Sequence, residues 1–231
     1  MLRLRSAALV LALAAAMPAA FAADGNTSGR AGIDKVNGSI DAGAGQVLGD
    51  LSTVNGSIRI ASGARTGDAE TVNGSIKIAD NVQCGDLTTV NGGIHLDAHA
   101  QVGGGIETVN GGIFVDRGGH VAKDITTVNG AIGLVDTDLD GGIDTVNGDI
   151  TVGVGSHVKG GIKVEKPNTS WIPIHFGKNT PPRIIIGPNA VVDGPLVFER
   201  EVKLYVHASA RIGKVTGATA IAYSGDRPPQ D

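Results

Sequence analysis

The chain carries a hydrophobic pattern with a period of 18 or 19 residues. The tripeptide Val-Asn-Gly recurs in steps of 18, 18, 18, 19, 19 and 18 residues. Each copy has an isoleucine at its fifth position, and most copies have another aliphatic residue two positions later. Further aliphatic residues lie near position 13 and just before the next copy, so an apolar residue returns roughly every six positions. The copies begin at Val36, Val54, Val72, Val90, Val109, Val128 and Val146.

This period predicts an all-β fold, a parallel β-solenoid with a triangular cross-section and 18 to 19 residues per coil. One coil cannot bury its own apolar edge, whereas coils stacked about 4.8 Å apart pair with the coils above and below. Stacking also explains why the same residue types recur at each position, because like lies over like. We place the seven Val-Asn-Gly coils in residues 23–164.

An antiparallel barrel of hairpins is the alternative, because Asn-Gly is also a strong hairpin signal. In a meander, however, equivalent positions lie two strands apart, where nothing favours identical residues. The second strand of each hairpin would also hold only about four residues before the next glycines. The pattern therefore favours parallel coils.

The recurring asparagines predict a ladder along one corner of the solenoid. A side-chain amide both donates and accepts, so stacked asparagines can hydrogen-bond along the axis. The glycine after each asparagine suits a left-handed or otherwise strained corner. The expected ladder residues are Asn37, Asn55, Asn73, Asn91, Asn110, Asn129 and Asn147.

The repeat stops at Glu165 and returns in altered form. Residues 165–183 contain four prolines, which cannot donate to a strand ladder, so we expect an inserted loop there. Its Trp171 and Phe176 are candidates for covering the core or for contacting a partner. Residues 184–216 show aliphatic runs with a step of 20 and predict further coils, and residues 217–231 read as a polar tail.

The first 22 residues have the features of a signal peptide. Arg3 and Arg5 precede an apolar stretch that is too short to span a bilayer, and Ala20-Phe21-Ala22 resembles a cleavage site. Cleavage leaves 17 basic and 23 acidic residues, a formal charge of −6. We therefore expect a periplasmic or secreted protein with no membrane span, and an acidic chain without a basic cluster argues against nucleic-acid binding.

The residues that carry chemistry are sparse. Aromatic residues make up 3% of the chain, and no HExxH, CxxC, GxSxG or phosphate-loop pattern is present. The lone Cys84 falls in an aliphatic column and is expected to be buried. The histidines are scattered along the chain. His120 and His157 share a coil position but lie two coils apart, too far to bind one metal ion, so we expect the histidines to be surface residues. We expect no catalytic residues and no organic cofactor, and a polysaccharide-active enzyme is the less favoured alternative.

One segment resembles the opening of a calcium loop. Asp136, Asp138 and Asp140 alternate with other residues and are followed by Gly141. Such a spacing supplies oxygen ligands at positions one, three and five and a turn glycine at six. Position twelve is Asn147 rather than the usual glutamate. The hypotheses are a calcium site and a solvated acidic turn, and Asp140 is expected in the slot that aliphatic residues fill in other coils.

The V-N-G-S-I and V-x-G-D-L runs resemble two families of bacterial β-solenoids. One is the bactofilins, polymer-forming proteins with a right-handed triangular helix, and the other is an exported putative adhesin-like family. The resemblance covers 33–162 well and 184–215 loosely. It implies a right-handed solenoid that acts as a filament or surface scaffold.

The sequence therefore predicts a non-enzymatic exported scaffold that self-assembles head to tail, because a stacked prism ends in unpaired strands unless it is capped. The alternative is an adhesin-like module that binds a cell-envelope component through a solenoid face or the Trp171 loop.

Overall fold

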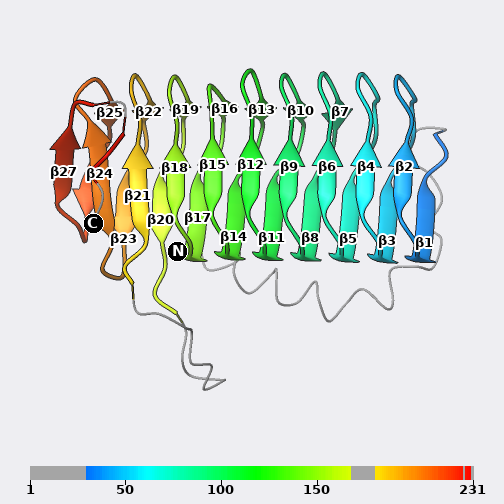
Figure 1. Cartoon of the computed structure of the whole chain (residues 1–231), viewed down its shortest axis with the longest axis horizontal. Helices are drawn as coiled ribbons and strands as arrows, with labels where there is room; N and C mark the ends of the chain where they lie inside the picture. Colours follow the sequence, from blue (N-terminus) through cyan, green and yellow to red (C-terminus); the bar gives the residue numbers. More distant parts are fainter. Residues whose placement is uncertain (1–29, 168–179, 226, 230–231) are drawn as a thin grey trace.

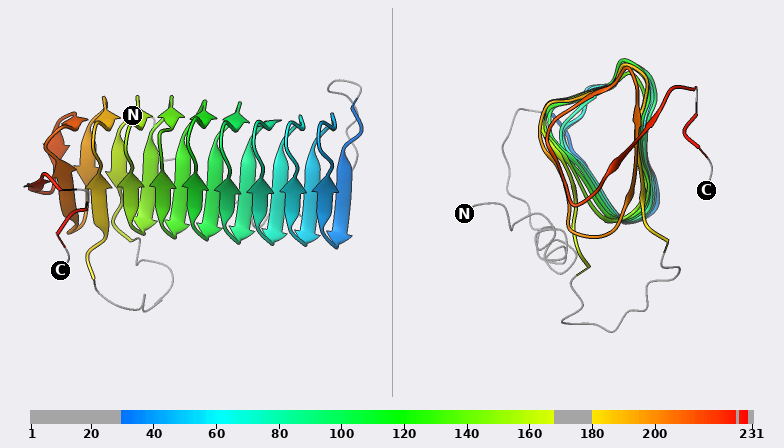
Figure 2. Two further views of the ribbon diagram at one scale, coloured as in Figure 1. Left: turned by 45° about the horizontal axis from the view of Figure 1, so that its top comes forward. Right: turned by 90° about the vertical axis from the view of Figure 1, so that its left-hand side faces the viewer.

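A computed structural model describes residues 30–167, 180–225 and 227–229, which form a three-sided parallel β-solenoid (Figures 1 and 2). Two sheets of ten strands and one of seven run along the rod within this part of the chain. Neighbouring strands in each sheet come from successive coils and pair in parallel, as in β1 with β3 and β2 with β4. The fold prediction is confirmed, and the antiparallel barrel is wrong.

We name the three sides of the prism sheets A, B and C. Each coil contributes one strand to sheet A and one to sheet B, and seven of the coils also contribute a strand to sheet C. Sheet A contains β1 (Ile33–Asn37), β3 (Leu51–Asn55), β5 (Ala69–Asn73), β8 (Leu87–Asn91), β11 (Ile106–Asn110), β14 (Ile125–Asn129), β17 (Ile143–Asn147), β20 (Ile162–Val164), β23 (Leu196–Phe198) and β26 (Val215–Thr216). Sheet B contains β2 (Ile40–Ala42), β4 (Ile58–Ile60), β6 (Ile76–Ile78), β9 (Ile94–Leu96), β12 (Ile113–Val115), β15 (Ile132–Leu134), β18 (Ile150–Val152), β21 (Arg183–Ile186), β24 (Lys203–His207) and β27 (Ala220–Tyr223). Sheet C contains β7 (Gln83–Cys84), β10 (Gln101–Val102), β13 (His120–Val121), β16 (Asp138–Leu139), β19 (His157–Val158), β22 (Val191–Val192) and β25 (Arg211–Ile212).

The register places equivalent residues of successive coils next to one another. Ile94 pairs with Ile113, and Ile113 pairs with Ile132. Side chains alternate between the two faces of a strand, so in a three-residue strand the first and third side chains share one face. In β9 these two residues are buried and point inward, whereas the central residue is exposed. The repeated aliphatic positions of the sequence are therefore the inward columns.

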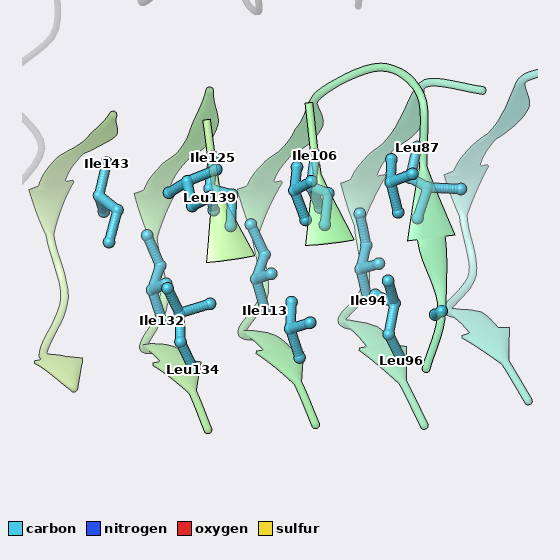
Figure 3. Packing of buried hydrophobic residues seen from close by; sticks show 14 of the residues in the cluster. Leu87, Ile94, Leu96, Ile106, Ile113, Ile125, Ile132, Leu134, Leu139 and Ile143 are labelled. Carbon is cyan, nitrogen blue, oxygen red and sulfur yellow. The ribbon is translucent and has the colours of Figure 1, made fainter. Parts of the chain in front are cut away.

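Aliphatic side chains from all three sheets fill the prism. Figure 3 shows Leu87, Ile106 and Leu139 pointing into the interior, where each is fully buried. Cys84 lies in the same column as Val102 and is 7% exposed, as the sequence predicts. Branched aliphatic side chains suit this narrow interior because identical shapes repeat along it and interlock without large rings.

The corner after each asparagine brings the backbones of adjacent coils close together. A Cβ atom built on Gly92 would lie 2.0 Å from the Gly74 carbonyl oxygen. Only glycine fits such a contact. Close approach of the next coil is thus the reason for glycine at this corner, and a left-handed backbone contributes at Gly38, where φ is 110°.

The coils continue on both sides of the expected insertion. β20 ends at Val164 and β21 begins at Arg183, and β18 pairs directly with β21. Ile162 is followed in its column by Leu196, a step of 34 residues instead of 18 or 19. The register therefore passes over the extra residues without interrupting the sheets.

The sequence predicts a polar tail without regular structure after residue 216, but part of this segment forms a strand. Ala220–Tyr223 form β27, which pairs with β24 and extends sheet B by one strand. Tyr223 is 8% exposed, and its hydroxyl donates to the Ile186 carbonyl over 3.3 Å. The preceding residues Gly217 to Thr219 cut across the corner, because Val215 and Ala220 are five residues apart where Leu196 and Leu204 are eight apart. This shorter path crosses the end of the prism (Figure 2).

Candidate functional site

The expected asparagine ladder is present along the corner between sheets A and B. Each amide nitrogen donates to the amide oxygen of the preceding coil, from Asn55 to Asn37 over 3.0 Å and on to Asn129 to Asn110 over 3.1 Å. All donors thus point toward the N-terminal end of the rod. The last step, Asn147 to Asn129, lengthens to 3.4 Å.

A second ladder, of threonines, lies inside the same corner and was missed by the sequence reasoning. A threonine precedes every Val-Asn-Gly copy except the first, which follows Lys35, and each of these threonines points inward and is at most 2% exposed. Thr71 Oγ1 donates to the Gly56 carbonyl over 2.8 Å, and Thr108 Oγ1 to Gly92 over 3.1 Å. The sequence feature that could have revealed this ladder is the extended repeat Thr-Val-Asn-Gly, in which the valine points outward. The buried members are Thr53, Thr71, Thr89, Thr108, Thr127 and Thr145.

Both ladders end at the coil of β17, next to the insertion. Thr145 Oγ1 is buried and, unlike its equivalents, has no hydrogen-bond partner among the described residues. Beyond it the column continues with the apolar Val164. Arg200, two coils further on, reaches back and donates to the Val146 carbonyl over 3.2 Å and to Asn147 Oδ1 over 3.4 Å. The guanidinium thereby supplies the donor that the next asparagine would have provided.

The position of Asp136 is explained by the turn at the corner between sheets B and C. Asp136 has φ of 45° and occupies the left-handed position of this turn. Glycine, asparagine, aspartate and histidine are the residues that tolerate such a backbone most readily. The same position is filled by Gly45, Gly63, Asn81, His99, Gly118, Gly155 and Asn189, all with positive φ.

The three aspartates occupy different column positions. Leu139, not Asp140, fills the aliphatic slot shared with Val121 and Val158, so the sequence assignment of that slot was one residue off. Asp138 points outward from β16. Within the described ranges, no group of three or more histidine, cysteine, aspartate and glutamate side chains is gathered as metal ligands. The calcium hypothesis thus gains no geometry from the fold.

Asp140 takes part in ion pairs on the outer face of sheet C. Lys159 Nζ lies 2.6 Å from Asp140 Oδ1, and His120 Nε2 lies 3.1 Å from Asp140 Oδ2. The hydrogen bond from Lys159 lowers the pKa of Asp140, and the same bond raises the pKa of Lys159. His157 pairs with Asp193 over 2.6 Å. His120 and His157 both adjoin Asp138, which confirms that they share a column two coils apart.

An acidic edge follows the corner between sheets C and A. Asp50 and Asp68 each accept a backbone N–H from the next coil over 3.0 and 2.8 Å. Glu70 lies beside them on the outer face of sheet A, where burial first and the neighbouring aspartates second raise its pKa. Burial and Asp86 likewise raise the pKa of Glu107. The edge repels anions, and its carboxylates already serve as backbone acceptors.

A shallow groove of about 770 Å³ runs along the outer face of sheet B over its first four coils. One wall is the column Asp41, Arg59, Lys77 and His95, which are register neighbours. The other side consists of the residues that follow each strand, which are small in the first three coils. The groove combines cationic side chains with an apolar floor, whereas a smaller hollow beside β14 and β17 is lined by no lysine, arginine or histidine.

The two ends of the rod differ. At the N-terminal end, β1 and β2 are the terminal strands of their sheets within the described residues, and Val36 is 60% exposed. At the C-terminal end, Tyr223 is 8% exposed, and its ring packs edge-on against His207 at 5.1 Å. The expected signal peptide and both loop candidates, Trp171 and Phe176, lie outside the described residues.

In the part of the chain that the structure covers, no helix is long and apolar enough to cross a bilayer. Comparisons with protein-family models, curated proteins and solved structures each find no match to this chain.

Proposed function

We propose that the protein is a non-enzymatic exported scaffold rod that assembles head to tail through its terminal coils. The observation that carries the proposal is the pairing pattern: every described strand pairs only with the coil before or after it, so the first and last coils leave strand edges. Such edges are templates for further strand pairing.

The inward columns of the two end coils are compatible with continued stacking. In a head-to-tail junction, Val215 would lie over Ile33 of the next copy, in the inward column of sheet A. Both are aliphatic and only partly shielded from solvent, and both pack against the core. Joining the ends would bury them and continue sheet A without a change of residue class.

A proline on the outer edge of β1 tests the assembly. Ile33 N–H donates to Asp50 in the second coil, so the next N–H, that of Asp34, points toward the free edge. Asp34→Pro removes this donor and should give monomeric rods, whereas Asp34→Ala keeps the donor and should assemble as the parent does. Electron microscopy and light scattering of the chain from Ala23 onward measure the outcome. A parent protein that stays monomeric at high concentration contradicts the proposal.

The second candidate is a cell-envelope binding module, and the groove on sheet B favours it. An exported rod with a cationic groove presents one face to a ligand while its ends stay free. Replacing residues 165–183 with the four-residue corner Val-Asn-Gly-Asp, which links Thr145 to Ile150 in the preceding coil, tests the other version of this candidate, which uses the Trp171 loop. Retention on isolated envelope fractions should be lost if that loop binds and unchanged if sheet B does.

A further inference from the structure

The groove on sheet B combines three kinds of chemistry in register. Its cationic groups come from consecutive coils, which places them about 4.8 Å apart along the rod. Its floor is small and apolar at Gly43, Ala61 and Ala79. A carboxylate lies at each end, Asp41 in the first coil and Asp97 in the fourth. The groove therefore changes sign along its length, from negative to positive to negative.

The cations of the groove are available to a ligand. Lys77 is exposed and its ammonium has no hydrogen-bond or ion-pair partner among the described residues. Arg59 contacts Asp41 over 3.6 Å, with both side chains more than half exposed, so this pair is weak. His95 is held by Asp97 at 3.1 Å and by a stacked contact with the Phe114 ring at 5.0 Å. The unsatisfied positive charge is thus centred between Arg59 and Lys77.

This charge pattern selects a class of ligand. A polyanion with a charge on every unit would place negative charges next to the carboxylates of Asp41 and Asp97, and these like charges would repel one another at short distance. Ionised carboxylates are acceptors only, so they bind hydroxyl or amide donors instead. The small floor admits the flat apolar face of a sugar ring. The occupant that fits is a chain with one acidic unit flanked by neutral, hydroxyl-rich units.

We propose that this groove binds a linear acidic glycan in which uronic-acid units alternate with neutral sugars, lying along the rod axis. The carboxylate of one unit lies between Arg59 and Lys77, and hydroxyl or amide donors of the neighbouring units reach Asp41 and Asp97. The proposal deepens the binding-module candidate and rests on it, and it is independent of end-to-end assembly.

Titration with defined oligosaccharides tests the ligand class. The probes are a hyaluronan hexasaccharide, which alternates acidic and neutral units, a fully acidic oligogalacturonate, the neutral chitohexaose and inorganic polyphosphate. Backbone amide shifts in NMR spectra of the full mature chain report the site. The hyaluronan fragment should bind most tightly and shift the amides of residues 59–61 and 77–79. Equal or tighter binding of polyphosphate or chitohexaose overturns the proposal, and so do shifts confined to another face.

Charge variants test the residues. Lys77→Gln and Arg59→Gln should each weaken hyaluronan binding by about tenfold, the size of one charge-assisted hydrogen bond. Lys123→Gln, on the distant corner beside Asp86, is the matched control and should bind as the parent does. An equal loss in all three variants would indicate general electrostatics and overturn the site. Asp34→Pro separates the two proposals. Light scattering should show that this variant is monomeric, and the same NMR titration should show that it still binds the hyaluronan fragment.

Discussion

The seven Val-Asn-Gly coils and the C-terminal coils after Arg183 share one backbone arrangement but hold it with different side chains. The Val-Asn-Gly coils have two polar ladders, glycine corners and a single aromatic residue, Phe114. The C-terminal coils lack both ladders and instead contain Phe198, Tyr205 and Tyr223, each at most 8% exposed. The backbone pairing continues through both regions.

This difference separates two requirements of the fold. Parallel pairing of coils and an apolar interior are common to both regions and are therefore sufficient to stack a coil. The ladders are an addition of the repetitive region, where identical neighbours make a continuous hydrogen-bonded column possible. The C-terminal coils stack without these ladders, and of their larger side chains Phe198 packs in the apolar interior.

The largest expected effect concerns the glycine corner that only the repetitive coils have. In Gly92→Ala, the new Cβ would lie 2.0 Å from the Gly74 carbonyl oxygen, so coils must separate locally. We expect the free energy of unfolding to fall by about 3 kcal/mol. The control is Gly63→Ala, which has φ of 70° but open space around the Cβ and should cost about 1 kcal/mol. Urea denaturation measures both, and equal losses would contradict the close-approach explanation.

The next effect compares a satisfied and an unsatisfied member of the threonine ladder. Thr108→Val removes a hydroxyl that donates to Gly92, and should cost about 1 kcal/mol. Thr145→Val removes a buried hydroxyl that has no partner in the part of the chain that the structure describes, and should be neutral or stabilising. Thermal and urea unfolding of the two variants give the comparison. A larger loss for Thr145→Val than for Thr108→Val would show that the ladder extends to the insertion.

A smaller and more local effect is expected at the junction between the two regions. Arg200→Ala removes the donor to Val146 and Asn147 and should cost at most about 1 kcal/mol. Hydrogen exchange should accelerate in β17 and β20 and remain unchanged in β5 and β8. Arg211→Ala, on the exposed face of β25, is the control. Uniform acceleration along the rod would mean that Arg200 acts on global stability.

The smallest effect is electrostatic and depends on pH. Because burial and neighbouring aspartates raise the pKa of Glu70, its ionised form is destabilised in the folded state. Glu70→Gln should therefore stabilise the protein by about a few tenths of a kcal/mol at neutral pH. The gain should vanish as the pH falls below 4.5, the ordinary value, where the carboxyl is protonated in both states. Melting temperatures across pH measure it, and the exposed Glu201→Gln should show no such dependence.

The repeat was sufficient to predict the columns but not the direction of every side chain. Asn110 and Ile113 were placed correctly because recurrence at a fixed step has a direct meaning in a stack. The burial of Thr108 was missed because threonine is compatible with either face of a strand. Asp140 was placed one position off, since a polar residue in a short strand gives no signal of register. The groove could not be predicted because it combines side chains from four separate coils.

The sequence by itself determined the architecture of this protein: the coil length, the inward aliphatic columns and the asparagine ladder follow from a period that repeats residue by residue. Tertiary structure alone decided what lies between and beyond the repeats. Arg200 reaches a coil that is 53 residues earlier, and Tyr223 folds onto Ile186 from a segment without the repeat. The physical reason is that periodicity encodes contacts at one fixed separation, whereas contacts at unique separations depend on the shape that the stacked coils have already formed.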